Sequence, residues 1–214
     1  IFTDLHRNVA IICSFSNKAV RMAMLGVPLL ILAVVTLVLM ITAHVVPEWF
    51  VLDVNSPELS FVRRVDTGLW KICQMGTFLP ERICLDYISD SGIENLSNTL
   101  RSAMAFGLLA TILAGMGLIL SIAMEMKGTL RTVLVVVLGP RILFAVSGLF
   151  MIVSASTFIG FVKQQEFDKV PFTKYGASFI IAWVTVATSL ASALLAHLHH
   201  SEQQAPAEGL PQPI

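Results

Sequence analysis

The stretch that decides the fold is Gly68-Leu69-Trp70-Lys71-Ile72-Cys73, which is followed by a second cysteine at Cys84. It lies in the one long polar region between the hydrophobic segments of the chain. A short aromatic motif is therefore combined with a cysteine pair in a strongly apolar protein. Because disulfides persist only in oxidising compartments, this pair indicates on which side of a membrane the region lies.

The composition is that of a membrane protein. Hydrophobic residues make up 56% of the chain, charged residues make up 13%, and the mean hydropathy is +0.80. These values depart from those of soluble proteins. The formal net charge is zero and no basic stripe is present, so we expect no nucleic-acid partner.

Four apolar segments are long enough to cross about 30 Å of hydrocarbon as helices, which takes about 20 residues each. We expect these spans at 20–46, 101–125, 133–162 and 175–198. They predict a single membrane domain at 20–200, with outer loops at 47–100 and 163–174. The segments 1–19 and 201–214 are then an N-terminal segment and a tail on the opposite side.

Two independent signals orient the chain. Lys18 and Arg21 lie at the N-terminal end of the first span, whereas no further Lys or Arg occurs before Arg63; this bias favours a cytoplasmic N-terminus, and four spans then place both termini in the cytoplasm. Cys73 and Cys84 agree, because a disulfide between them requires the extracellular or lumenal side. Two free or metal-binding thiols are the alternative, and the loop's lack of His and of a second Cys pair argues against it.

The long outer loop has the pattern of a small sheet. Three short segments are rich in β-branched and aromatic residues, namely Glu48–Val54, Leu59–Val65 and Arg82–Ile88. We expect an antiparallel sheet stapled by the disulfide, followed by a helical turn at Leu96–Arg101. Eight acids and four bases lie between Pro47 and Leu100. This acidic face suits cations or a basic partner, with mixed solvated charge as the alternative.

Charged residues are scarce within the four expected spans. Arg141 is the exception inside the third segment, and we expect it to snorkel to the interface. His44 lies one turn before the outer end of the first span, where we also expect an interfacial position. Arg101 begins the second span on the outer side and is a candidate anchor between loop and helices.

Three further features are candidate modification or metal sites. Cys13 is a juxtamembrane cysteine and a candidate for palmitoylation, with an unmodified thiol as the alternative. Asn95-Leu96-Ser97 is a formal glycosylation sequon close to the membrane. We interpret the histidines near the tail as a solvated cluster rather than a metal site; they are His197, His199 and His200.

No enzyme signature is present. The chain has no phosphate-binding Gly-rich loop, no H-E-x-x-H and no G-x-S-x-G. We therefore expect no catalytic residues, no cofactor and no metal.

The constellation of four spans and outer-loop motifs resembles the claudin superfamily, which includes the peripheral myelin proteins, the calcium-channel γ subunits and the transmembrane AMPA-receptor regulatory proteins. The residues that carry this resemblance are Trp49, Gly68, Leu69, Trp70, Cys73, Cys84 and Arg101. The resemblance implies a left-handed four-helix bundle topped by an extracellular β-sheet. In that fold Trp49 and Trp70 pack where the sheet meets the membrane, and the disulfide joins neighbouring strands.

Two features favour the channel and receptor auxiliary branch. Lys71 follows the motif tryptophan as in γ subunits, and Tyr175-Gly176-Ala177-Ser178-Phe179 is similar to the start of the last span in AMPA-receptor regulators. We therefore expect a noncatalytic plasma-membrane subunit whose partners are lipid and the pore-forming chains of an ion channel or receptor. The candidate contact residues are Lys71, Glu81, Arg82, Asp86 and Asp90.

A claudin-like adhesion protein is the alternative. Pro47-Glu48-Trp49 is close to the P-x-W motif of barrier-forming claudins. Such a protein self-associates at cell contacts, and its acids, here Asp53, Glu58 and Asp66, select ions by charge. A myelin-type or trafficking protein is a third interpretation.

Overall fold

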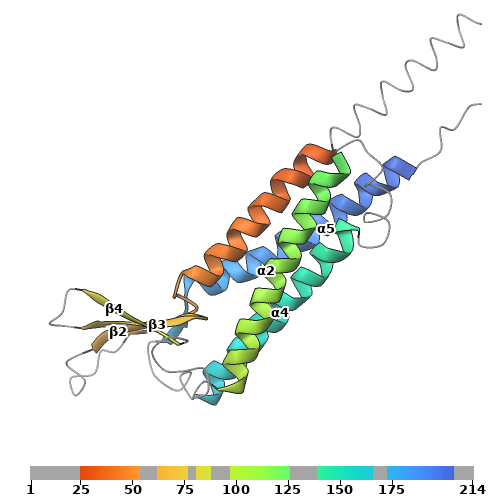
Figure 1. Ribbon diagram of the computed structural model, residues 1–214. Helices are drawn as coiled ribbons and strands as arrows, with labels where there is room; N and C mark the ends of the chain where they lie inside the picture. The colour runs from red at the N-terminus through yellow and green to blue at the C-terminus, as the bar shows by residue number, and fades with distance from the viewer. Residues whose placement is uncertain are drawn as a thin grey trace, which may run out of the picture.

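Four helices lie side by side and a sheet lies across one end of them (Figure 1). This computed structural model describes residues 25–53, 62–76, 81–87, 97–125, 139–165 and 173–204. The helices are the first helix at Leu25–Val45, α2 at Asn98–Glu125, α4 at Pro140–Gln164 and α5 at Ala177–Gln204.

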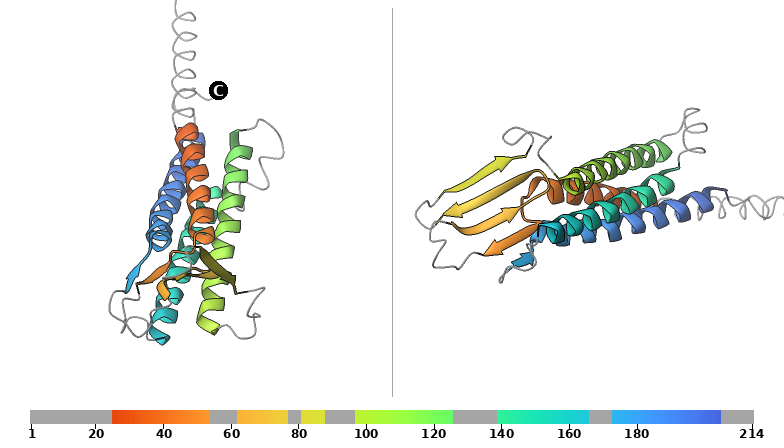
Figure 2. Two further views of the ribbon diagram at one scale, coloured as in Figure 1. Left: turned by 90° about the vertical axis from the view of Figure 1, so that its left-hand side faces the viewer. Right: turned by 90° about the horizontal axis from the view of Figure 1, so that it is seen from below.

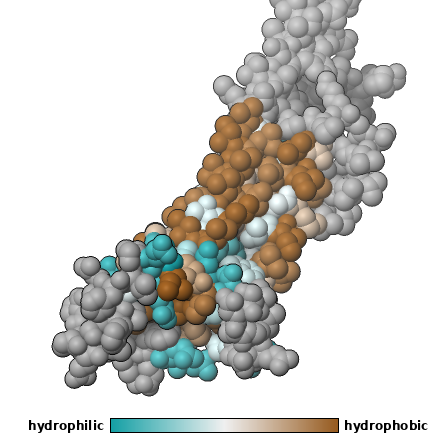
Figure 3. Space-filling model, turned by 60° about the vertical axis from the view of Figure 1, so that its left-hand side comes forward, coloured by the Kyte–Doolittle hydropathy of each residue, from teal (hydrophilic) through white to brown (hydrophobic). Residues whose placement is uncertain are grey.

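Each of these four helices is long and apolar enough to cross a membrane. Large apolar side chains on their outer faces are exposed, such as Ile31, Ile119 and Leu149. Water would penalise such a surface, whereas lipid tails do not. Figure 3 shows this division: hydrophobic residues cover the helical part, and hydrophilic residues gather at the end that carries the sheet.

The helix boundaries follow from local chemistry. The hydroxyl of Ser97 accepts a hydrogen bond from the Leu100 amide at 3.2 Å, which caps the start of α2. α4 begins at Pro140, whereas the sequence places the third span from 133. Gly139 is extended, with φ −40° and ψ 139°, and proline suits the first helical position because it has no N–H to satisfy. Residues 133–138 lie outside the described part.

Small residues and serines form the contacts inside the bundle. Ala110 and Ala114 of α2 are completely buried, which allows neighbouring helices to approach closely. Two hydroxyls of α4 donate to carbonyl oxygens of α2: Ser147 to Ala110 and Ser154 to Ala103, each at 2.7 Å. These hydrogen bonds satisfy buried polar groups and hold α2 against α4.

Two histidines pack against neighbouring parts of the protein, and one of them differs from the expectation. His44 turns toward α2, where a Cβ on Gly107 would be 2.5 Å from its Nε2, and its Nδ1 donates to the Met40 carbonyl oxygen at 2.6 Å. His199 is only 1% exposed, so a solvated cluster is the wrong interpretation for this residue. α5 continues past the expected end at 198, and one of its faces remains covered there.

The sheet has five antiparallel strands in the order β4-β3-β2-β1-β5 (Figure 2). Their bounds are β1 Phe50–Asp53, β2 Val62–Thr67, β3 Lys71–Gly76, β4 Arg82–Asp86 and β5 Thr173–Tyr175. The expected antiparallel sheet is present, and the three expected strands overlap β1, β2 and β4. β3 and β5 were not expected, because β3 has a single β-branched residue and β5 is only three residues long.

A substitution at Gly176 tests how closely the segment before α5 approaches the backbone of Glu48. A Cβ at this position would overlap the backbone carbonyl of Glu48, so we expect Gly176→Ala to destabilise the protein by at least about 1–3 kcal/mol, the usual cost of overpacking. Gly160→Ala is the matched control, because beyond its own helix turn and chain neighbours no described residue comes within 4 Å of its added Cβ. Thermal unfolding and monodisperse yield in detergent measure both. Equal stability of the two variants would contradict the close approach.

Candidate partner-binding surface

Trp49 joins the sheet to the bundle. Its side chain is fully buried, and its indole Nε1 donates to the Ala43 carbonyl oxygen of the first helix at 2.5 Å. Its ring lies edge-on to Phe158 of α4 and Phe179 of α5, with centroids 5.0 and 6.0 Å away. One residue before β1 therefore contacts three of the four helices, which sets the position of the sheet.

The Gly68-Leu69-Trp70 motif forms the turn between β2 and β3. The Gly68 amide donates to the Lys71 carbonyl oxygen at 2.9 Å, and a Cβ at Gly68 would be 2.7 Å from the Cα of Pro47. Leu69 is buried in the core cluster that contains Trp49, and Trp70 packs against that cluster. The motif thus presses the turn onto the bundle, and Lys71 is the first residue of the strand that leaves it.

The disulfide predicted from the sequence is present. Cys73 of β3 lies directly opposite Cys84 of β4, with the two Cα atoms 4.0 Å apart. Because β4 is the last strand at its side of the sheet, β3 is its only strand neighbour among the described residues. The disulfide therefore holds in place the strand that carries Arg82 and Asp86, two of the candidate contact residues.

Asp66 is the centre of an ion network within the sheet. Its side chain is 6% exposed and accepts hydrogen bonds from Arg64 Nε at 2.6 Å and from Arg82 Nη2 at 2.5 Å. Arg64 also lies 3.6 Å from Glu48. The hydrogen bond to Asp66 raises the pKa of Arg64 above its ordinary value. The network connects β2 to β4 across β3 and neutralises the buried carboxylate.

Four of the candidate contact residues lie together on the β4 side of the sheet. Glu81 and Asp86 are exposed, Arg82 is bound to Asp66, and Lys71 is half-buried opposite Asp86 in the strand register. Asp90, Asn95 and Cys13 lie outside the described residues. The Arg101 side chain is half-buried in the first turn of α2.

Two features of this surface were not predicted from the sequence. Ile83 and Leu85 of β4 are 53% and 48% exposed, and their alternation with Cys84 was the signal that one face of the strand is apolar. Lys174 Nζ of the second outer loop lies 3.1 Å from Asp53 Oδ2 of the first. This ion pair depends on the pairing of β1 with β5, which no local pattern indicates.

Exposed charged and exposed apolar side chains occur together on this surface. Among the described residues, no group of three His, Cys, Asp or Glu side chains is arranged to hold a metal ion. Burial raises the pKa of Tyr87 to about 12, which keeps this phenol neutral at physiological pH. The edge strand offers exposed charges beside exposed apolar side chains, a combination typical of interface rims and cores.

Four helices long and apolar enough to span a membrane and a disulfide-bonded sheet at one end of them are the features of a multi-pass membrane protein. Its sequence matches the model of the PMP-22/EMP/MP20/Claudin family over residues 21–196, so the chain belongs to this family. The comparison with curated proteins gives no match. Family membership covers several kinds of membrane protein on one fold, so the function is argued from the surface itself.

Substitutions of Asp66 and of Asp53 by alanine form a matched pair of variants. Asp66→Ala leaves two guanidinium groups without their buried carboxylate, so we expect a loss of about 1.5–3 kcal/mol, as for hydrogen bonds to charged groups. Asp53→Ala removes a pair whose lysine is 63% exposed, and we expect a loss below about 1 kcal/mol. Thermal unfolding in detergent compares them. A larger effect at Asp53 would contradict the central role of Asp66.

The disulfide is tested by Cys73→Ser and Cys84→Ser. We expect each variant to lose about 3 kcal/mol of stability, the chain-entropy value for a short loop, and to reach the cell surface poorly. Surface labelling and mobility on nonreducing gels provide the measurements. Wild-type surface levels together with unchanged mobility would show that the bond is not structural.

Proposed function

We propose that this protein is a noncatalytic auxiliary subunit of an ion channel or ligand-gated receptor in the plasma membrane. The sheet faces the extracellular side and both termini face the cytoplasm, because the Cys73–Cys84 disulfide requires an oxidising compartment. The first helix, α2, α4 and α5 pack beside the pore-forming chains, and the sheet contacts their extracellular parts.

The observation that carries this proposal is the exposure of β4. All five of its residues are exposed, although the strand is fixed by the disulfide and by the Arg82–Asp66 ion pair. A rigid, exposed strand is ready to bind a partner with little loss of conformational entropy. Ile83 and Leu85 supply apolar area, and Glu81 and Asp86 supply charge that selects a basic surface.

The same geometry weakens the alternative of a charge-selective barrier. That function requires acids which face a permeation path with their charge uncompensated. Asp66 is bound by two arginines and Asp53 by Lys174, so neither offers an uncompensated charge. Glu58 lies outside the described residues. Glu81, beside β4, is exposed where a protein partner can approach.

The mechanism is a bias on gating. An auxiliary subunit shifts the equilibrium between two channel states only as far as its contacts favour one of them. A contact worth about 1.4 kcal/mol more in one state changes that equilibrium about tenfold. The junction at Trp49 makes sheet and helices one rigid unit, so β4 keeps its position while the partner moves.

Charge reversal on β4 tests the contact. We expect Glu81→Lys and Asp86→Lys to reduce the shift in gating about two- to fivefold when coexpressed with the partner channel, because exposed charge pairs contribute about 0.5–1 kcal/mol. Lys163→Glu is the control, a charge change of equal size and opposite sign at the last turn of α4. Recorded currents, normalised to surface expression, provide the measurement. Unchanged gating in both β4 variants would contradict the assigned surface.

Mild solubilisation of the native protein tests the class of function. We expect pore-forming subunits to co-purify in fixed stoichiometry. Self-assembled strands at cell contacts, with no such subunits and with a change in transepithelial conductance, would favour the claudin-like barrier and exclude the auxiliary function.

A further inference from the structure

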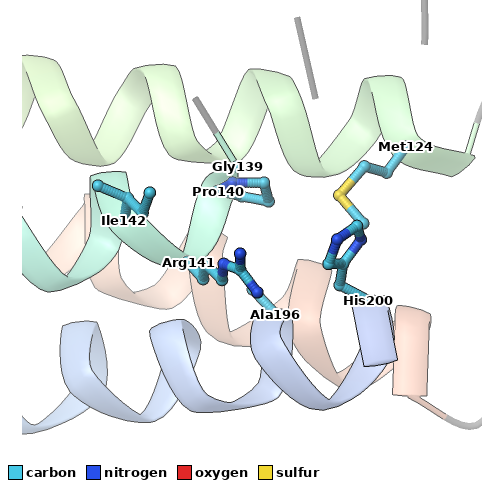
Figure 4. Close-up of a pocket in the computed structure, with 7 residues that line it drawn as sticks. All are labelled: Met124, Gly139, Pro140, Arg141, Ile142, Ala196 and His200. Carbon is cyan, nitrogen blue, oxygen red and sulfur yellow. The ribbon is translucent and has the colours of Figure 1, made fainter. Parts of the chain in front are cut away.

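Two places at opposite ends of the described structure differ in what they offer to another macromolecule. The hollow at the end of the bundle away from the sheet is lined by Met124, Pro140 and Ala196, among others (Figure 4), and its volume is about 20 Å³. This is room for one water-sized group. β4 is exposed along its whole length and is the outermost strand on its side of the sheet (Figure 2). Of these two places, β4 is the one that a protein chain can contact.

The residues of β4 alternate between backbone groups that face β3 and backbone groups that face away from it. Cys84 lies opposite Cys73 with the Cα atoms 4.0 Å apart, the short spacing of a pair that exchanges no backbone hydrogen bonds. The Tyr87 amide, three positions further on, donates to the Trp70 carbonyl oxygen at 2.9 Å. Both observations give the same alternation, in which three residues direct their backbone groups away from β3, namely Arg82, Cys84 and Asp86.

This outer backbone side of β4 has the properties of a template for a further strand. None of the described strands pairs with β4 there. β4 contains no proline, and its register with β3 is regular, so two common protections of an edge strand, a proline and a bulge, are missing. An extended segment can therefore add to the sheet through main-chain hydrogen bonds.

The sequence of β4 is complementary to itself when it is read in the opposite direction. The strand reads Arg82-Ile83-Cys84-Leu85-Asp86. When two copies pair antiparallel about Cys84, Arg82 of each copy lies opposite Asp86 of the other, and Ile83 lies opposite Leu85. Pairs of opposite charge in these positions stabilise antiparallel strands, and the apolar pairs bury area that is exposed in one copy. A shift by two residues removes both charge pairs, so the charges select this register.

The two charged residues keep their contacts within their own copy. Arg82 Nη2 donates to Asp66 Oδ2 at 2.5 Å, and the Arg82 side chain is 35% exposed. Asp86 is exposed and lies opposite Lys71 of β3. A guanidinium has five N–H donors and a carboxylate accepts several hydrogen bonds, so an internal bond and a bond across the edge are compatible. The internal bond also holds Arg82 in place, which reduces the entropy lost on binding.

We infer that a second copy of this chain binds at β4, edge to edge, so that the two sheets become one continuous sheet. The contact is two-fold symmetric and therefore closed, so the pair does not grow into a polymer. This inference goes beyond the proposed function, because it concerns the chain without a channel. The second copy occupies the strand that a channel subunit contacts, so self-pairing and channel binding compete.

Native mass spectrometry of the full chain in neutral detergent, over a range of protein concentrations, tests the pairing. We expect a monomer–dimer equilibrium for the wild type. Asp86→Lys places two bases opposite each other at both ends of the paired strands, and we expect dimerisation to weaken about tenfold or more. Glu81→Lys is the matched control, because it makes the same change of charge where the register places the uncharged Tyr87 opposite. We expect it to dimerise as the wild type does.

A charge exchange between copies tests the register. Arg82→Glu alone places two acids opposite each other, so we expect its dimer to be about as weak as that of Asp86→Lys. When the two variants are mixed, opposite charges face each other at both ends again. We therefore expect a mixed dimer of about wild-type strength, which its mass distinguishes from either dimer of identical copies.

Thermal unfolding of each variant shows that it is folded. If Arg82→Glu does not fold because Asp66 has lost a partner, the comparison of Asp86→Lys with Glu81→Lys decides alone. A wild type that remains monomeric, equal dimerisation by Asp86→Lys and the wild type, or an equal loss in Glu81→Lys would overturn the inference. Assemblies that keep growing with concentration would overturn it too, because they require an open contact. The measurement contains no channel, so such a failure is separate from a failure of the gating test.

Discussion

Burial of Trp49 at the junction of sheet and helices is the interaction on which the rest of the structure depends. Its side chain contacts the first helix, α4 and α5, while its backbone amide donates to Thr67 at 3.1 Å and its carbonyl accepts from Gly176 at 3.0 Å. A buried tryptophan of this kind contributes about 3–5 kcal/mol. The bundle, the β2–β3 turn and the second outer loop all take their positions from it.

Much of this fold can be predicted from short segments of the sequence. The spans are predicted because a run of about 20 apolar residues is long enough to cross a membrane as a helix. The disulfide is predicted because two cysteines lie in the same loop. The fifth strand and the Asp66 network are not local. Thr173–Tyr175 is too short to show a strand period, and Asp66 meets Arg82 only because the register of β2, β3 and β4 places them on one face.

The candidate contact residues show the same limit. Their position in this loop is evident from the sequence, but the sequence does not show which of these charged side chains form internal ion pairs. The structure assigns Arg82 to an internal ion pair and leaves Glu81 exposed. Counting acids and bases along the loop does not show which of them are paired: Asp66 is bound by Arg64 and Arg82, and Asp53 lies beside Lys174 of the other loop.

The pairing of β1 with β5 has a consequence for biosynthesis. The long first loop is synthesised early and β1 can pair with β2 of the same loop, but it pairs with β5 only when the segment before α5 has been made. Until then Phe50 lacks Tyr175 and Trp49 lacks Phe179, although Phe158 of α4 is already available to Trp49. The sheet therefore stays incomplete until most of the chain has been made. A truncated product without the last helix exposes this unfinished edge, a form that quality-control chaperones can recognise.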